Sequence, residues 1–298
     1  DLKYTWPSCV APSTRLDNFT MMEIHDDGVR WMDMEDNLRR GQIMTVWSIL
    51  DAGNYRYIVE YGFRDDGVVR FRLGSTGRNL RPKEDDGGDN HLHTGCWRVE
   101  LALGDPDDNE VYISRRIALE NGRTSHTMER VTRETDIAWN SQEFTRMRVI
   151  NRGQLDGHLP PNNIGYDLIP ERNGQVHTFR GDELFLNRDF FVTTAVPQSP
   201  ESAGEVPQLT YRKLNDSYLQ TREDVTDRAT VLWHHSSLSH TSRDEDFTRE
   251  GYGVTGAVAL NAWVGFHLVP RNLFSSTPLY PNPPGESAAK PEFLQGDY

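Results

Sequence analysis

The sequence has 298 residues, of which 36% are apolar, and it carries 32 Lys and Arg against 45 Asp and Glu, a net charge of −13. This length and apolar content suffice for a buried core and exclude a disordered chain. A surface this acidic repels phosphate backbones, so nucleic acid is not expected as a partner.

Three patterns bear on where the chain resides. The most apolar stretch, residues 254–269, is interrupted by Asn261 and His267, so no membrane span is expected. No signal peptide is visible at the start of this chain. Two sequons, beginning at Asn18 and Asn215, permit secretion. Localisation stays open.

Hydrophobic residues alternate with a period of two along much of the chain, which is typical of β-strands. The first clear case is residues 57–64, joined to the alternating segment 69–73 by Asp65-Asp66-Gly67, a turn that predicts a hairpin. Similar segments follow at 97–103, 111–119 and 146–151. Sustained helical periodicity is scarce. We therefore predict an all-β protein, a large twisted antiparallel β-sandwich forming one domain over 1–298 with a Pro-rich C-terminal tail at 278–298.

Histidines gather at two places. His91 and His93 are spaced i and i+2, so in a strand both imidazoles point to one face and can bind one ion. A second cluster holds His234, His235 and His240, and a third imidazole from this distant segment would complete a nitrogen-rich site that suits Cu(II), with zinc as competitor. Glu245 or Asp246 could orient the ligand rings. The alternative is a pair of ordinary surface histidines and a solvated polar loop.

Three segments resemble, in order, the catalytic domain of copper amine oxidases, enzymes whose topaquinone cofactor derives from a tyrosine. The segments are Gly53-Asn54-Tyr55-Arg56-Tyr57, His91-Leu92-His93, and Trp233-His234 followed by His240 and Arg243-x-Glu245-Asp246-Phe247. The resemblance covers roughly residues 5 to 283 and leaves out the family's smaller N-terminal domains.

The resemblance implies an active site and a reaction. His91, His93 and His240 would bind copper, Tyr55 would be the topaquinone precursor, and Asn54 would restrain its ring. The implied activity is oxidative deamination of a small-molecule substrate, a primary amine, to an aldehyde with peroxide and ammonia. The family is homodimeric, so a homodimer is implied as well.

The chain departs from the family pattern beside the cofactor tyrosine. Arg56 stands where the family has an acidic residue, and Asp51 stands where it has Thr or Ser. The family's catalytic aspartate and the tyrosine that hydrogen-bonds the quinone would fall before residue 1, with Asp27 or Asp33 as conceivable substitutes. Cys96 is close enough in sequence to His93 to perturb a bound copper, or it is a buried small hydrophobe.

Two readings of the function follow. In the first, the protein is a copper amine oxidase. In the second, the amine-oxidase fold is repurposed: it binds another small molecule, or catalyses a redox-neutral step such as cyclisation or cycloaddition in a biosynthetic pathway. Loss of a general base alone typically costs about 10² to 10⁴ in rate, and a fold survives such a loss.

Overall fold

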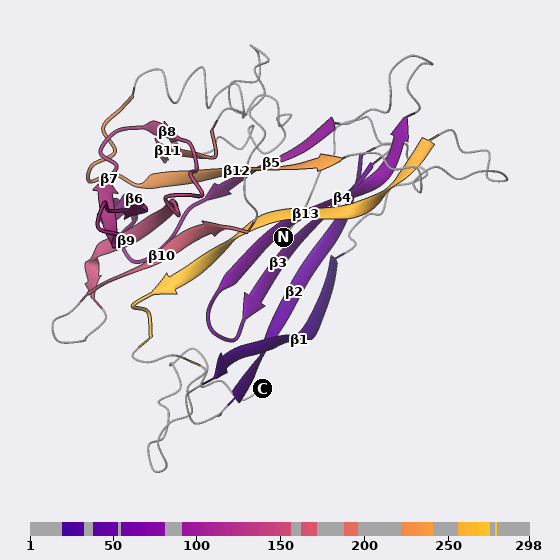
Figure 1. The fold of residues 1–298 in the computed structure, drawn as a ribbon, viewed down its shortest axis with the longest axis horizontal. Helices are drawn as coiled ribbons and strands as arrows, with labels where there is room; N and C mark the ends of the chain where they lie inside the picture. Colours follow the sequence, from indigo (N-terminus) through magenta and orange to yellow (C-terminus); the bar gives the residue numbers. More distant parts are fainter. Residues whose placement is uncertain are drawn as a thin grey trace.

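The computed structural model describes residues 20–32, 38–52, 55–80, 91–155, 162–171, 188–195, 222–240, 256–274 and 278. Antiparallel strands make up nearly all of the regular structure in these ranges, with one short 3-10 turn, η2 (Pro106–Asp108) (Figure 1). No helix among the described residues is long and apolar enough to cross a membrane.

The larger of two sheets has nine strands in the order β1-β2-β3-β4-β13-β10-β9-β6-β7. Their bounds are β1 (Thr20–Met32), β2 (Leu38–Ala52), β3 (Tyr55–Arg64), β4 (Val69–Leu80), β6 (Asn109–Ala118), β7 (Thr124–Arg130), β9 (Arg146–Leu155), β10 (Asn163–Pro170) and β13 (Gly256–Arg271). All the paired strands run antiparallel. The long strand β13 joins the hairpins at the N-terminal side to those in the middle of the chain (Figure 1).

The smaller sheet has four strands in the order β5-β12-β11-β8. Their bounds are β5 (His91–Val99), β8 (Thr135–Ile137), β11 (Phe190–Thr194) and β12 (Thr230–His240). Strand β12 is central, since it pairs with β5 on one side and β11 on the other.

The core lies where the two sheets face each other. Phe266 of β13 is fully buried and stacks on Phe71 of β4 with ring centroids 4.7 Å apart. Trp97 of β5 contacts both rings edge-on from the opposite sheet. Apolar side chains of both sheets continue this layer: Val99, Val111, Ile113, Ile137, Met147, Val149, Leu168, Phe190, Val192, Leu232 and Leu268. The predicted antiparallel β-sandwich is therefore confirmed.

The predicted hairpin is also confirmed. β3 and β4 are joined through Gly67, which has φ +80° and so occupies a conformation that L side chains rarely adopt. The amide of Arg64 donates to the carbonyl of Val68 at 3.0 Å, closing the turn. Consequently the first residue of β3 lies at the far end of the hairpin from this turn.

One strand boundary differs from the sequence prediction. The alternating segment was predicted over 97–103, whereas β5 already begins at His91 and ends at Val99. The reason is pairing: β12 continues opposite β5 as far as His240, so its ladder extends the strand through both histidines. The single domain over 1–298 stays a prediction, and most of its proposed tail lies outside the described residues.

Candidate functional site

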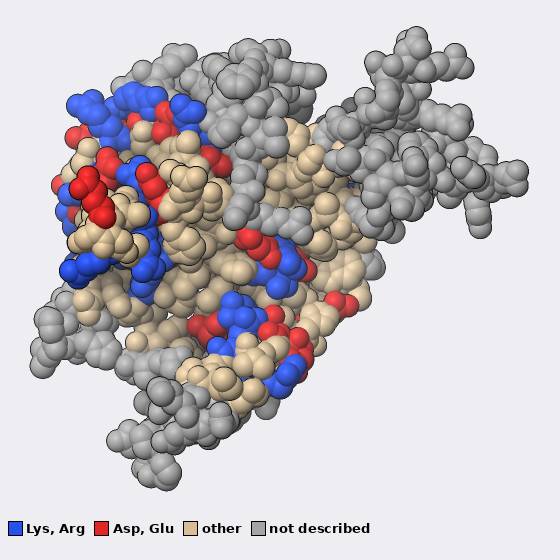
Figure 2. Space-filling model, in the orientation of Figure 1, with Lys and Arg blue, Asp and Glu red and all other residues tan. Residues whose placement is uncertain are grey.

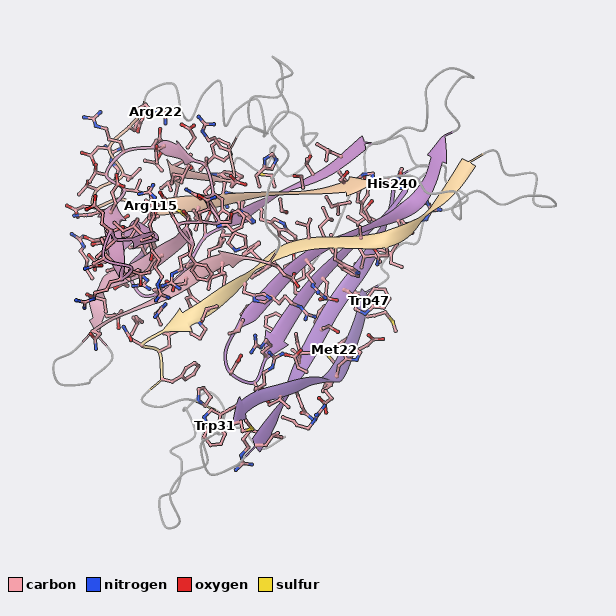
Figure 3. The ribbon with its side chains drawn as sticks, in the orientation of Figure 1. Met22, Trp31, Trp47, Arg115, Arg222 and His240 are labelled. Atoms are coloured by element: carbon pink, nitrogen blue, oxygen red, sulfur yellow. The ribbon has the colours of Figure 1, made fainter. Side chains whose placement is uncertain are left out.

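A tyrosine and two histidines meet between the two sheets. Tyr55 opens β3 in the larger sheet and is buried, 6% exposed. Its hydroxyl hydrogen-bonds to Nδ1 of His240, at the end of β12 in the smaller sheet (Figure 3 labels His240). Its ring lies against the imidazole of His93, with centroids 4.3 Å apart. The three side chains therefore form one buried cluster that spans both sheets.

The two histidines come from neighbouring strands of the smaller sheet. His93 of β5 and His240 of β12 are both buried, and their ring centroids are 6.2 Å apart with an interplanar angle of 27°. Backbone pairing places His91 directly opposite His240. The side chain of His91 is outside the described set, and among the described side chains no group of three His, Cys, Asp or Glu is placed to hold a metal. Two of the three predicted ligands are thus brought together, and Asn54 lies outside the described residues.

Sequence analysis missed a second tyrosine at this cluster. The hydroxyl of Tyr57 is 2.8 Å from Nδ1 of His93, and its ring centroid is 6.3 Å from that of Tyr55. Burial raises the pKa of the Tyr57 phenol, so the hydroxyl stays protonated. The signal was present in the sequence, because Tyr57 follows Tyr55 by two positions in a strand and must share its face.

The two departures from the family pattern form a single ion pair. Asp51 of β2 and Arg56 of β3 are direct cross-strand partners, and Nη1 of Arg56 is 2.5 Å from Oδ1 of Asp51. Arg56 also donates to the carbonyl of Tyr55 at 3.2 Å. Since neighbouring residues of a strand point to opposite faces, this pair lies behind the sheet from the Tyr55 ring. The charge of Arg56 is therefore balanced by Asp51, and the hydrogen bond of its side chain stabilises the backbone at Tyr55.

His234, the histidine of the Trp-His motif, has a structural position. Its Nδ1 donates to the carbonyl of Asp189 at 3.0 Å, and its ring packs between Phe190 and Phe266 at 5.0 and 5.2 Å. Burial lowers its pKa to about 3, so the ring is neutral at pH 7. His234 therefore ties β12 to the start of β11 and lies away from the Tyr55 cluster.

Cys96 is partly buried and packs as a small hydrophobe, which is the second of the two roles considered for it. It packs against Phe191, Val231 and Trp233, and burial raises the pKa of its thiol to about 12. Being an odd number of positions from His93, it points to the other face of β5. A protonated thiol facing away from the histidine pair is a poor copper ligand.

Asp27, the one conceivable substitute base that the structure describes, is not brought to the site. Asp27 forms ion pairs with Arg30 and Arg64, and Arg64 ends β3 while Tyr55 begins it. A strand of this length separates its two ends by roughly 30 Å. Asp27 is therefore far from the Tyr55 cluster. Asp33, Glu245 and Asp246 lie outside the described residues.

The described residues thus place a buried tyrosine–histidine cluster between two antiparallel sheets. The family model "Copper amine oxidase, enzyme domain" matches residues 17–289. This chain belongs to the copper amine oxidase family.

Individual relatives are distant. The chain is 22% identical to copper amine oxidase 1 of Schizosaccharomyces pombe over 92% of this chain and 43% of that protein. It is 22% identical to histamine oxidase of Arthrobacter globiformis over 88% of this chain and 42% of that protein. It thus spans less than half the length of these curated relatives.

Solved structures show the same fold. A copper-containing benzylamine oxidase from Hansenula polymorpha superposes with a TM-score of 0.71 at 18% identity, covering 88% of this chain and 45% of that chain. The lysyl oxidase of Pichia pastoris gives a TM-score of 0.64 at 17% identity, covering 94% and 45%. At these identities the likeness establishes the fold.

The depressed pKa of His234 predicts an acid-sensitive component of stability. Because the folded pKa of about 3 is below the unfolded value near 6.5, the folded state is favoured above pH 6.5 and loses stability as pH falls toward 3. The slope from this group approaches about 1.4 kcal/mol per pH unit. His234→Asn keeps a donor for the Asp189 carbonyl without titrating, so denaturant unfolding of the variant should show a shallower slope. Equal slopes for the two proteins would contradict the prediction.

The ion pair of Asp51 and Arg56 predicts strong coupling in a double-mutant cycle. Arg56→Met should lower the free energy of unfolding by about 1–2 kcal/mol, discounted for the partial exposure of Arg56, because the buried Asp51 carboxylate loses its partner. Asp51→Asn combined with Arg56→Met should cost less than the sum of the single changes. Additive effects in urea unfolding would show that the two side chains do not interact.

Proposed function

We propose that this domain binds copper through His93, His240 and His91, and that Tyr55 becomes the quinone cofactor of a primary-amine oxidase. The observation that supports this most directly is the position of Tyr55, whose hydroxyl bonds to His240 while its ring lies on His93. A phenol held against two candidate metal ligands is suitably placed for metal-dependent oxidation. The copper amine oxidase family of the chain supports the same conclusion.

The chemistry of the donor set fits copper. Imidazole nitrogen suits Cu(II) best among the divalent first-row ions, and His93 and His240 are buried side by side. Tyr57 at Nδ1 of His93 and Tyr55 at Nδ1 of His240 orient the two rings, and Nε2 is then the nitrogen through which each ring would bind the ion. When bound, copper would supply the redox chemistry by which O₂ oxidises the adjacent phenol.

The protein's own residues provide position and exclusion of water. Burial of Tyr55 keeps bulk solvent from the reacting ring, and the ion pair of Asp51 and Arg56 holds its backbone from behind. The overall reaction balances as RCH₂NH₂ + O₂ + H₂O → RCHO + NH₃ + H₂O₂. By family likeness we also propose that the domain works as a homodimer.

A second candidate function rests on the same ion pair. Asp51 and Arg56 replace the uncharged and the acidic residue that flank the cofactor tyrosine in the family pattern. On this alternative Tyr55 remains an unmodified tyrosine, and the site binds a small molecule or catalyses a redox-neutral step such as cyclisation or cycloaddition.

Formation of the cofactor separates the two candidates. The purified chain is loaded with copper in air, treated with phenylhydrazine, and the Tyr55 peptide is examined by absorbance and mass spectrometry. This readout reports cofactor formation and does not require turnover of an amine. We expect a coloured adduct on Tyr55. Bound copper without an adduct would favour the redox-neutral alternative.

Matched tyrosine variants make that experiment specific. Tyr55→Phe should abolish the adduct, because the reacting phenol is gone. Tyr57→Phe at saturating copper should retain the adduct, because the Tyr57 hydroxyl contacts Nδ1 of His93 and is not the reacting phenol. An adduct that persists in Tyr55→Phe would show that another residue carries the reactive carbonyl.

Tyr57 should also set copper affinity. Removal of a hydrogen-bond partner of a metal-binding histidine typically costs about 10- to 100-fold in affinity. We therefore expect Tyr57→Phe to weaken copper binding by about this factor in a competition titration, with a changed nitrogen hyperfine pattern by electron paramagnetic resonance. Tyr61→Phe is the control, since Tyr61 shares this face of β3 but packs on Phe71 and Trp97. Equal copper affinity in the Tyr57 and Tyr61 variants would contradict the role.

A further inference from the structure

Three arginines surround one buried carboxylate on the outer face of the nine-stranded sheet. Asp167 of β10 is fully buried. Arg148 approaches it at 2.6 and 3.1 Å, Arg271 at 2.7 Å, and Arg146 at 3.5 Å. The side chains of Asp167 and Arg148 point away from the core, since their neighbours Leu168 and Met147 point into it. The cluster has two more positive than negative charges.

Further nitrogen donors lie on this face beyond the cluster. Arg116 of β6 donates to the Thr124 hydroxyl at 3.0 Å, and within the described ranges no carboxylate pairs with it. His126 of β7 is its cross-strand partner and bonds to the Ser114 hydroxyl at 2.6 Å. Figure 2 shows basic and acidic side chains interspersed at the end of the molecule formed by β6, β7 and β9. The local excess of arginine around Asp167 therefore rests on the contacts given above.

Two of the arginines have weak acceptors. Nη1 of Arg148 donates to the thioether of Met128 at 3.2 Å, although sulfur is a poor acceptor. Nε of Arg146 lies 3.3 Å from the Ser114 hydroxyl and 3.5 Å from Oδ2 of Asp167, so neither contact is short. Met128 is exposed, so solvent reaches this side of the cluster. These donors would gain strength from a charged oxygen acceptor.

The guanidinium groups of the cluster repel one another. Burial lowers the pKa of Arg146, and the charges of Arg271 and Arg148 lower it further despite the attraction of Asp167. Burial and the same three guanidinium groups lower the pKa of His126. An anion placed among these groups would relieve the repulsion between the guanidinium groups.

We propose that Arg146, Arg148 and Arg271, together with Arg116 and His126, form a binding site for a small oxyanion such as a phosphoryl or carboxylate group. Asp167 beneath them orders the guanidinium groups, which then present parallel N–H donors to the ligand. The site lies on the outer face of the larger sheet, whereas the Tyr55 cluster lies between the sheets. It is therefore independent of the proposed oxidase activity.

Calorimetric titration with inorganic phosphate and with acetate, each against sodium chloride of equal ionic strength, tests the site. We expect saturable binding above the chloride control. Tighter binding of phosphate than of acetate would indicate a phosphoryl ligand, and tighter binding of acetate would indicate a carboxylate ligand. Arg146→Gln should weaken binding about tenfold, or ~1.4 kcal/mol. Arg115→Gln should leave it unchanged, because Arg115 faces the other way and pairs with Glu129 at 2.9 Å (Figure 3 labels Arg115).

The outcomes that overturn the proposal are equally concrete. The proposal is wrong if neither phosphate nor acetate binds above the chloride control. It is also wrong if Arg146→Gln and Arg115→Gln weaken binding equally. If Arg146→Gln fails to fold, the exposed Arg116→Gln takes its place and should weaken binding several-fold, since it removes a cation that no described carboxylate balances. Unchanged binding in Arg116→Gln would then count against the site.

Discussion

The hydrogen bond between Tyr55 and His240 is the contact on which the candidate site depends, because its two partners belong to different sheets. Neither sheet alone assembles the cluster: β3 supplies the two phenols, and β5 and β12 supply the imidazoles. The sheets are held at the required separation by the aromatic layer of Phe71, Trp97 and Phe266. The geometry of the site is thus a consequence of how the core packs.

Much of this arrangement could be predicted from local sequence. A two-residue period is enough to place His91 and His93 on one face, and the turn at Gly67 predicts the hairpin that follows Tyr55. The same period would have placed Tyr57 beside Tyr55. What local sequence does not contain is which strands face each other across the sandwich, so the partners of these side chains followed only from tertiary structure.

Strand register explains the other differences between the sequence predictions and the structure. Asp51 and Arg56 looked like two separate departures from the family pattern, yet the pairing of β2 with β3 makes them one ion pair. The pairing of β12 with β5 likewise extends the strand back to His91, ahead of the predicted segment 97–103. In both cases hydrogen bonds to a neighbouring strand decided the outcome, and such pairing is set by the whole sheet.

The cluster divides its groups between the sheets: both described imidazoles, His93 and His240, lie on the smaller sheet, and the Tyr55 phenol lies on the larger one. The docking of the sheets therefore sets the distance from the phenol to the imidazoles, whereas the spacing of the two imidazoles is set within one sheet. A substitution that loosens the aromatic layer between the sheets would consequently displace the phenol from a pair of histidines that itself stays intact.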